Sequence, residues 1–247
     1  KKGSDYPDWT GHTGDVHIYP YKEVVSSCGF YGLVLHSGTF QPDNISGSNY
    51  NKLFEKNRVV VHNGATIAIE SGTRGIRIGE LATETGSSLT GYYKKSSAIS
   101  YYIIGGKNSN AELAGKIYNS ASGNKVGIIK EGTGTYVISG TNNDINGGIR
   151  LTKGTLLIEN DIEKTKAENG SGATGKYGSV IVYEDAILGG NGSIASATEV
   201  YGSIKPANNS LGTLYFTDFQ SNPSQVNVTL HPESNIVCQI SSANSYD

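Results

Sequence analysis

Several features of ordinary proteins are scarce in this chain of 247 residues. It has only 6 prolines, which excludes a collagen-like helix and a proline-rich linker. No run of about 18 apolar residues occurs, so we expect no membrane insertion by this segment. The formal net charge is only −2, and its 20 Lys and Arg are intermixed with 22 Asp and Glu. Because nucleic-acid binders concentrate basic charge on one face, we expect no nucleic-acid partner.

Cysteine and methionine are also scarce, with two and none respectively. Cys28 and Cys238 are too far apart for a metal-binding motif, so we expect two separate buried thiols, with a disulfide between the chain ends as the alternative. The sequence begins at Lys1 without a recognisable signal peptide. We therefore expect a processed product or a fragment of a larger chain.

Helical periodicity is almost absent, and its best candidate is the short segment 161–169. Glycine, in contrast, is abundant at 33 residues, about twice its usual share of roughly 7%. Between glycines, apolar residues alternate with polar ones, as in 64–70, where Ala65, Ile67 and Ile69 share one face. The segments 225–230 and 236–240 alternate in the same way. A period of two with one apolar face predicts strands that are packed on one side.

A short unit of glycine, a small polar residue and an aliphatic residue recurs along the chain. It begins at Gly64, Gly134, Gly154, Gly192, Gly202 and Gly212. Short strands with glycine corners favour a coiled stack, because glycine accepts positive φ at a turn and stacked coils bury an aliphatic ladder. The sequence therefore predicts an all-β fold, a single-stranded parallel β-helix of about ten coils with roughly 20–25 residues each. A β-sandwich is the alternative.

The central part of the chain resembles the passenger-associated repeat of bacterial autotransporters. Residues 126–143 contain an aliphatic residue followed by Lys-Glu-Gly-Thr-Gly-Thr, a strand, and Ser-Gly-Thr-Asn-Asn, which is similar to the opening of that repeat. Residues 147–158 resemble its second half, with a Gly-Gly turn before a strand and Gly-Thr-Leu. Further similar pieces lie at 104–115, 186–194 and 202–214. The resemblance covers roughly residues 103–216 of one β-helix domain, with unmatched coils or caps at 1–102 and 217–247.

The resemblance implies a right-handed β-helix of a bacterial exported protein, outside the cell or on its surface, and it implies no reaction. We therefore expect a non-catalytic structural or adhesive module. Paired tyrosines along the chain could add weak contact with a polysaccharide or a cell-surface glycan, since tyrosine offers a flat ring with a polar tip. Tyr92, Tyr101 and Tyr183 are the candidate ligand-binding residues, although stacked ladder residues are the plainer interpretation.

The alternative is a polysaccharide-active enzyme or the β-helical part of one. A lyase needs calcium or another cation to neutralise the uronate, and a basic residue to remove the α-proton. Arg74 and Arg77 are the basic candidates. A glycosidase needs two carboxylates across a groove, for which Glu80, Glu84 and Asp185 are available. The simpler interpretation is that these residues are dispersed outer-face charges.

Metal and phosphate sites find little support in the sequence. His12, Asp15 and His17 offer three potential ligands without a fixed fourth, and we expect a solvated arm there. His36 and His62 are expected to face outward. The glycine-rich segments 104–107 and 132–135 lack the helix and the Gly-Lys-Ser/Thr ending of a phosphate loop. We therefore expect these glycines to be corners, and no cofactor.

Overall fold

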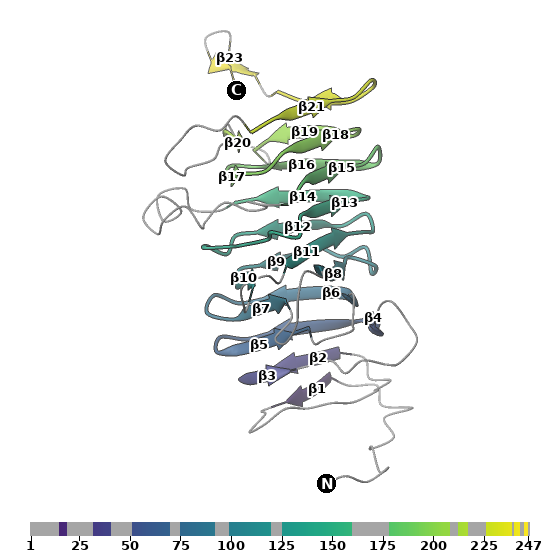
Figure 1. The fold of residues 1–247 in the computed structure, drawn as a ribbon, viewed down its shortest axis with the longest axis vertical. Helices are drawn as coiled ribbons and strands as arrows, with labels where there is room; N and C mark the ends of the chain where they lie inside the picture. Colours follow the sequence, from purple (N-terminus) through teal and green to yellow (C-terminus); the bar gives the residue numbers. More distant parts are fainter. Residues whose placement is uncertain are drawn as a thin grey trace.

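The computed structural model describes most of the chain, in eleven segments. They are residues 15–18, 32–40, 51–69, 75–91, 99–119, 125–159, 178–207, 212–216, 226–238, 240–242 and 245–246. The described residues are all-β and contain no helix, and Figure 1 shows their strands stacked in layers from the N-terminal to the C-terminal end. The helix predicted at 161–169 lies outside them.

Most of the described strands pair in three sets, here called columns, within which each strand lies parallel to the next. The first column includes residues 58–61 of β4 and 80–83 of β6. Its ten members are β1 (Asp15–Ile18), β2 (Gly32–Leu35), β4 (Asn51–Val61), β6 (Gly75–Thr83), β9 (Ala111–Leu113), β12 (Thr135–Ile138), β14 (Gly154–Ile158), β16 (Ala186–Gly190), β19 (Ser203–Pro206) and β22 (Asn235–Ile236).

The second column begins with the first halves of β4 and β6, so these two long strands join both columns into one large sheet. Its other members are β8 (Ile99–Ile104), β11 (Lys125–Lys130), β13 (Ile149–Leu151), β15 (Val180–Val182), β18 (Thr198–Val200) and β21 (Val228–Leu230).

The third column is a smaller parallel sheet. It comprises β3 (Gly38–Phe40), β5 (Ala65–Ala68), β7 (Ser88–Gly91) and β10 (Lys116–Asn119). A separate parallel pair joins β17 (Ser193–Ile194) to β20 (Tyr215–Phe216), and the antiparallel hairpin of β23 (Ile240–Ser242) and β24 (Ser245–Tyr246) lies near the C-terminal end (Figure 1).

Neighbouring layers are successive in the sequence, and we call one passage of the chain through the columns a tier. Side-chain hydrogen bonds between adjacent tiers span 22 residues from Arg58 to Glu80 and 32 residues from Glu159 to Asn191. The tiers therefore differ in length, and the differences are accommodated between the strands. This parallel pairing differs from that of the antiparallel β-sandwich considered above.

The interior is an aliphatic ladder, formed by side chains at equivalent positions of successive strands. Ala65, Ile67 and Ile69, predicted to share a face, are all buried. In the first column, Leu113, Ile138 and Ile158 occupy equivalent positions on three successive strands, and all three are fully buried. The prediction of one packed strand face is thus confirmed at these positions.

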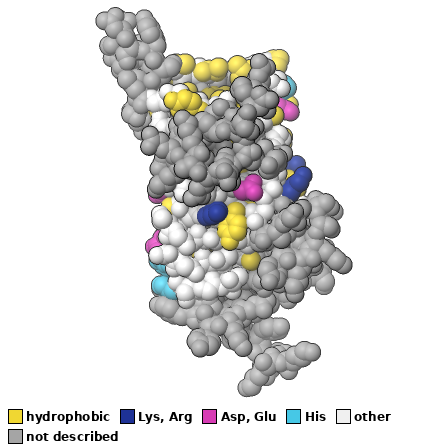
Figure 2. Space-filling view, turned by 60° about the vertical axis from the view of Figure 1, so that its left-hand side comes forward, with side chains coloured by type: hydrophobic (Ala, Val, Ile, Leu, Met, Phe, Trp, Pro, Cys, Tyr) yellow, Lys and Arg dark blue, Asp and Glu magenta, His cyan; other side chains and the backbone are white. Residues whose placement is uncertain are grey.

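The tier at the C-terminal end carries the same pattern without a cover. Leu230 pairs with the fully buried Val200, yet it is 48% exposed, and Ile236 pairs with the buried Ile204 and is 54% exposed. Figure 2 shows hydrophobic side chains gathered at this upper end of the molecule. Core-type positions therefore lie open to solvent on β21 and β22.

Glycine corners and buried polar side chains close the turns between strands. Gly105 has φ of 100°, and a Cβ there would lie 2.1 Å from the carbonyl oxygen of Glu131 in the next tier, so a side chain is excluded twice over. Asn143, in the Ser-Gly-Thr-Asn-Asn motif, is fully buried. Its amide nitrogen donates to the Gly140 carbonyl, and its oxygen accepts from the backbone nitrogen of Ile117 one tier below.

A buried tyrosine links the second and third columns across the interior. The Tyr102 hydroxyl lies 2.8 Å from the carbonyl oxygen of Ile67 and 2.9 Å from that of Thr90. Burial raises the pKa of Tyr102, so the hydroxyl stays protonated and donates.

We expect Tyr102→Phe to lower the free energy of unfolding by about 1–3 kcal/mol, because the buried carbonyls lose a donor that water cannot replace. Chemical denaturation followed by circular dichroism measures the change. Tyr215→Phe is the matched control, since Tyr215 is 44% exposed and its substitution should change stability little. Equal effects of both substitutions would contradict this role of Tyr102.

Candidate functional site

A vertical row of side chains follows the ends of the second-column strands, where the chain turns toward the first column. We call this row the corner ladder. Backbone hydrogen bonds of 2.8–3.0 Å extend the strand register by one residue at each of its levels. From the middle of the stack to its C-terminal end, the ladder consists of Glu131, Thr152, Tyr183, Tyr201 and His231.

The upper corner ladder forms a stack of aromatic rings. The rings of Tyr201 and His231 lie 3.8 Å apart at an angle of 9°. The rings of Tyr183 and Tyr201 are 6.4 Å apart at 20°. Parallel pairing brings these residues into line, since each follows the last residue of its strand. Three near-parallel rings therefore rise along one edge of the molecule.

An open hollow of about 560 Å³ lies beside these rings. Its walls combine the two tyrosine rings with aliphatic and acidic side chains from neighbouring tiers. The lining residues are Thr152, Ile181, Tyr183, Glu184, Asp185, Glu199 and Tyr201. Aromatic faces beside a few hydrogen-bonding groups are typical of sites for small polar ligands.

Glu199 connects two of the stacked rings electrostatically. The Tyr201 hydroxyl donates to the Glu199 carboxylate at 3.3 Å, and His231 Nε2 lies 3.8 Å from the same oxygen. Desolvation, together with the hydrogen bond and the charge of Glu199, raises the pKa of the Tyr201 phenol. Tyr201 is therefore a neutral donor that holds the Glu199 carboxylate at the hollow.

The three candidate tyrosines have different surroundings. Tyr183 is 40% exposed and lines the hollow. Tyr101 is buried, because its ring lies over Gly127, where a Cβ would come within 2.6 Å of it, and the Arg150 guanidinium lies 5.4 Å from the ring centroid. Tyr92 lies outside the described residues. Of the described pair, only Tyr183 offers its ring to a ligand.

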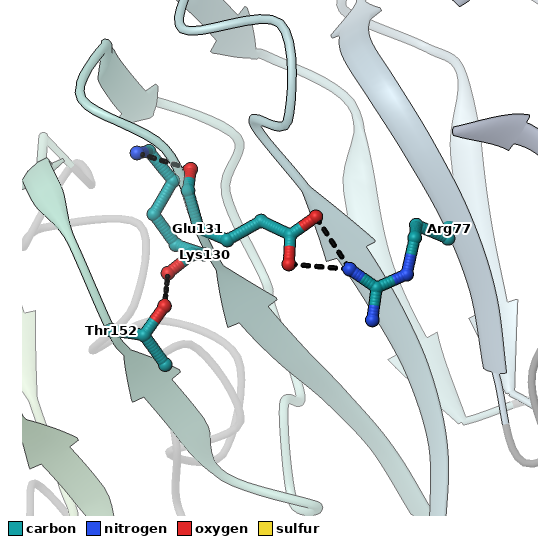
Figure 3. Close-up of polar contacts among 4 residues, drawn as sticks. All are labelled: Arg77, Lys130, Glu131 and Thr152. Atoms are coloured by element: carbon teal, nitrogen blue, oxygen red, sulfur yellow. Dashed lines mark hydrogen bonds and ion pairs between the residues drawn. The ribbon is translucent and has the colours of Figure 1, made fainter. Parts of the chain in front are cut away.

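Arg77, a candidate base, is held in an ion pair that crosses two tiers. Its Nη1 donates to both carboxylate oxygens of Glu131, at 2.7 and 2.6 Å, as Figure 3 shows. A Cβ on Gly106, in the tier between, would lie 3.3 Å from the Glu131 carboxylate, so the absence of a side chain there leaves room for this contact. The geometry makes Arg77 a link between tiers.

The other charged candidates are dispersed. Glu80 accepts from Arg58 Nε at 2.8 Å, and Asp185 lies 3.7 Å from Lys153. The structure therefore pairs Glu80 and Asp185 with different cations, and only Asp185 lines the hollow. The candidate base Arg74 lies outside the described residues.

Glu84 belongs to a second row, which follows the first-column strands. It lies 2.6 Å from His62 Nδ1, and His62 stacks on His36 with 4.7 Å between ring centroids. The hydrogen bond from the Asn63 backbone, followed by that from His62, lowers the pKa of Glu84. Glu84 thus supports a turn.

Lys130 is buried at the corner between columns. Its Nζ lies 2.9 Å from the carbonyl oxygen of Glu131, 2.8 Å from that of Gly132 and 3.1 Å from that of Lys153. Its own carbonyl accepts from the Thr152 hydroxyl (Figure 3). Burial lowers the pKa of Lys130 to about 8. The lysine of the repeat-like motif therefore ties two consecutive corners together.

Among the described residues, no three His, Cys, Asp or Glu side chains are grouped to hold a metal ion, and no helix could span a membrane. The side chains of His12, Asp15 and His17 lie outside the described part. Cys238 is an exposed free thiol, contrary to its expected burial, and Cys28 lies outside the described residues.

Comparison with known proteins yields no relative: no protein-family model matches the chain, and the curated proteins contain no match to it.

Sequence reasoning missed five lining residues of the hollow, which are Thr152, Ile181, Glu184, Glu199 and Tyr201, and it missed His231, which stacks on Tyr201. A signal for Tyr201 and His231 was present, because three second-column strands end at an aliphatic residue that an aromatic one follows, at 182–183, 200–201 and 230–231. Recognising it required the strand register, since the intervals between the three pairs differ.

We expect Arg77→Met to lower the free energy of unfolding by about 1 kcal/mol, because it leaves the half-buried Glu131 carboxylate without its cation. The matched control is Lys153→Met, because Lys153 and its partner Asp185 are both exposed and lie 3.7 Å apart, so that its loss should cost less. Urea denaturation at low and high salt measures the free energy of unfolding of both variants. A larger loss from Lys153→Met would contradict the role assigned to Arg77.

Because Lys130 is buried, we expect the free energy of unfolding to increase as the pH is raised above about 8. Its pKa is about 8 in the folded protein and 10.5 in the unfolded chain, so between these values the unfolded state binds more protons and stability increases with pH. Relative to Lys130→Met, the wild-type protein should gain at most about 3 kcal/mol between pH 8 and 10.5. Denaturation at a series of pH values measures the difference, and a constant difference would exclude the effect.

Proposed function

We propose that the chain is a non-catalytic β-helical scaffold of a bacterial exported or surface protein, with weak glycan contact at the upper corner ladder. Successive tiers that pair in parallel support a single-stranded β-helix, and the ten strands of the first column fit about ten coils. The strong preference of parallel crossovers for one hand supports a right-handed coil. Export is supported by the resemblance to the autotransporter repeat.

The observation that carries the scaffold proposal is the use of charged side chains between tiers. Arg77 and Glu131 join one pair of tiers, and Arg58 and Glu80 join another. Lys130 donates to backbone carbonyls on two successive corners. Charges engaged in this way maintain the stack, and they favour mechanical support over reaction chemistry.

Glycan contact is supported by the hollow beside Tyr183 and Tyr201. Sugar rings present apolar C–H faces and hydroxyl edges, which complement aromatic faces and carboxylate acceptors respectively. Both kinds of surface line this hollow. The open, shallow setting fits a weak contact along a chain of sugars.

The test of this function is binding of the purified chain to a panel of neutral, basic and acidic polysaccharides by affinity electrophoresis. Tyr201→Ala should weaken binding about three- to tenfold, the range expected for loss of an aromatic contact. Tyr215→Ala is the control, because this exposed tyrosine lies on β20, outside the second column. Equal binding by both variants would contradict the site, and absence of binding to the whole panel would contradict glycan contact.

A polysaccharide-active enzyme is the second candidate, because the two carboxylates Asp185 and Glu199 line one hollow. A pair of carboxylates is the machinery of glycoside hydrolysis. Mass spectrometry of the same polysaccharides after incubation would detect shortened products. Products that disappear with Asp185→Asn and with Glu199→Gln would establish the enzyme and overturn the scaffold proposal.

A further inference from the structure

We propose that the hollow beside the upper corner ladder selects sugars that carry a protonated amine. The inference rests on the proposed glycan contact and adds the chemical class of the ligand. The deciding features are the aromatic rings, which form one wall, and the carboxylates of Glu184, Asp185 and Glu199, which line the same space.

The aromatic wall provides the first element of recognition. His231 covers one face of Tyr201, and the other face is turned toward Tyr183, whose ring lies 6.4 Å away at 20°. The faces of aromatic rings carry negative electrostatic potential, so they attract both C–H groups and cations. A sugar bound in the hollow would lie beside these rings and beside the acidic residues that line the same space.

The charge of the hollow provides the second element. Its lining includes three carboxylates and no Lys or Arg. The nearest described cation to Asp185 is Lys153 at 3.7 Å, and both side chains are largely solvent-exposed. An ammonium group can donate three hydrogen bonds to acceptor-only carboxylates, whereas a uronate would add a like charge to them.

The carboxylates of Glu131 and Glu199, which lie in different tiers, have different partners. At the lower level, the Glu131 carboxylate is engaged by Arg77 through both oxygens, at 2.6 and 2.7 Å. At the upper level, Glu199 receives one hydrogen bond from the neutral Tyr201 and has His231 at 3.8 Å. Among the contacts of the described residues, Glu199 thus has no Lys or Arg partner, and it is one of the residues that line the hollow.

The experiment compares three oligosaccharides of equal length by isothermal titration calorimetry: glucosamine oligomers, their N-acetylated counterparts and oligogalacturonate. A buffer of about pH 5.5 keeps the amine protonated. We expect the amine-bearing oligomer to bind about tenfold more tightly than the acetylated one. Its affinity should fall as salt is raised, because salt screens exposed charges.

Glu199→Gln and Asp185→Asn locate the effect, since each keeps the size of the side chain and removes its charge. Each should reduce the preference for the amine severalfold, and the double variant should remove it. Glu112→Gln is the control, because Glu112 pairs with Ser139 on the first column, away from the hollow. An unchanged preference in the double variant would overturn the site.

The remaining outcomes separate this inference from the function on which it rests. Equal binding of the amine-bearing and acetylated oligomers, lost in Tyr201→Ala, would overturn selection for an amine and leave glycan contact standing. Failure of all three oligosaccharides and of the polysaccharide panel to bind would overturn both. Tighter binding of oligogalacturonate would overturn the inference by showing that a cationic surface is in use.

Discussion

The parallel backbone register is the constraint on which every other feature depends. Because each second-column strand pairs residue by residue with the strand in the next tier, any position is repeated directly above itself. The interior consequently becomes a continuous aliphatic ladder, and the exterior becomes a set of vertical rows. Side-chain identity along a row then determines whether neighbouring tiers pack, form ion pairs or leave a hollow.

The corner ladder shows that one structural position can carry side chains with different contacts in different tiers. Its lower level has a carboxylate at Glu131, which forms the ion pair with Arg77 across a tier where Gly106 leaves room for the contact. Its upper levels have Tyr183 and Tyr201, whose rings stack. The ion pair and the stacked rings thus occupy different levels of one row without a change in backbone pairing.

The fold class followed from local features of the sequence, whereas the site depended on distances that the sequence does not contain. The glycine-initiated units coincide with strands, since Gly134 directly precedes β12 and Gly154 is the first residue of β14. Arg77 and Glu131, however, are 54 residues apart. Because the tiers vary in length, the spacing of these two residues in the sequence does not predict that their side chains meet. The burial of Tyr101, a candidate ligand-binding residue, likewise depends on another tier, because its ring lies over Gly127 in the next one.

The uncovered tier at the C-terminal end has a consequence for how the stack loses its order. A tier in the middle of the stack is held from both sides, whereas β21 and β22 have one parallel neighbour each, and their Leu230 and Ile236 side chains face solvent. In a one-dimensional array, the free energy of a unit is dominated by its nearest-neighbour interfaces. We therefore expect this tier to open more readily than the middle of the stack, so that amide protons of β21 exchange with solvent before those of β13 at the centre.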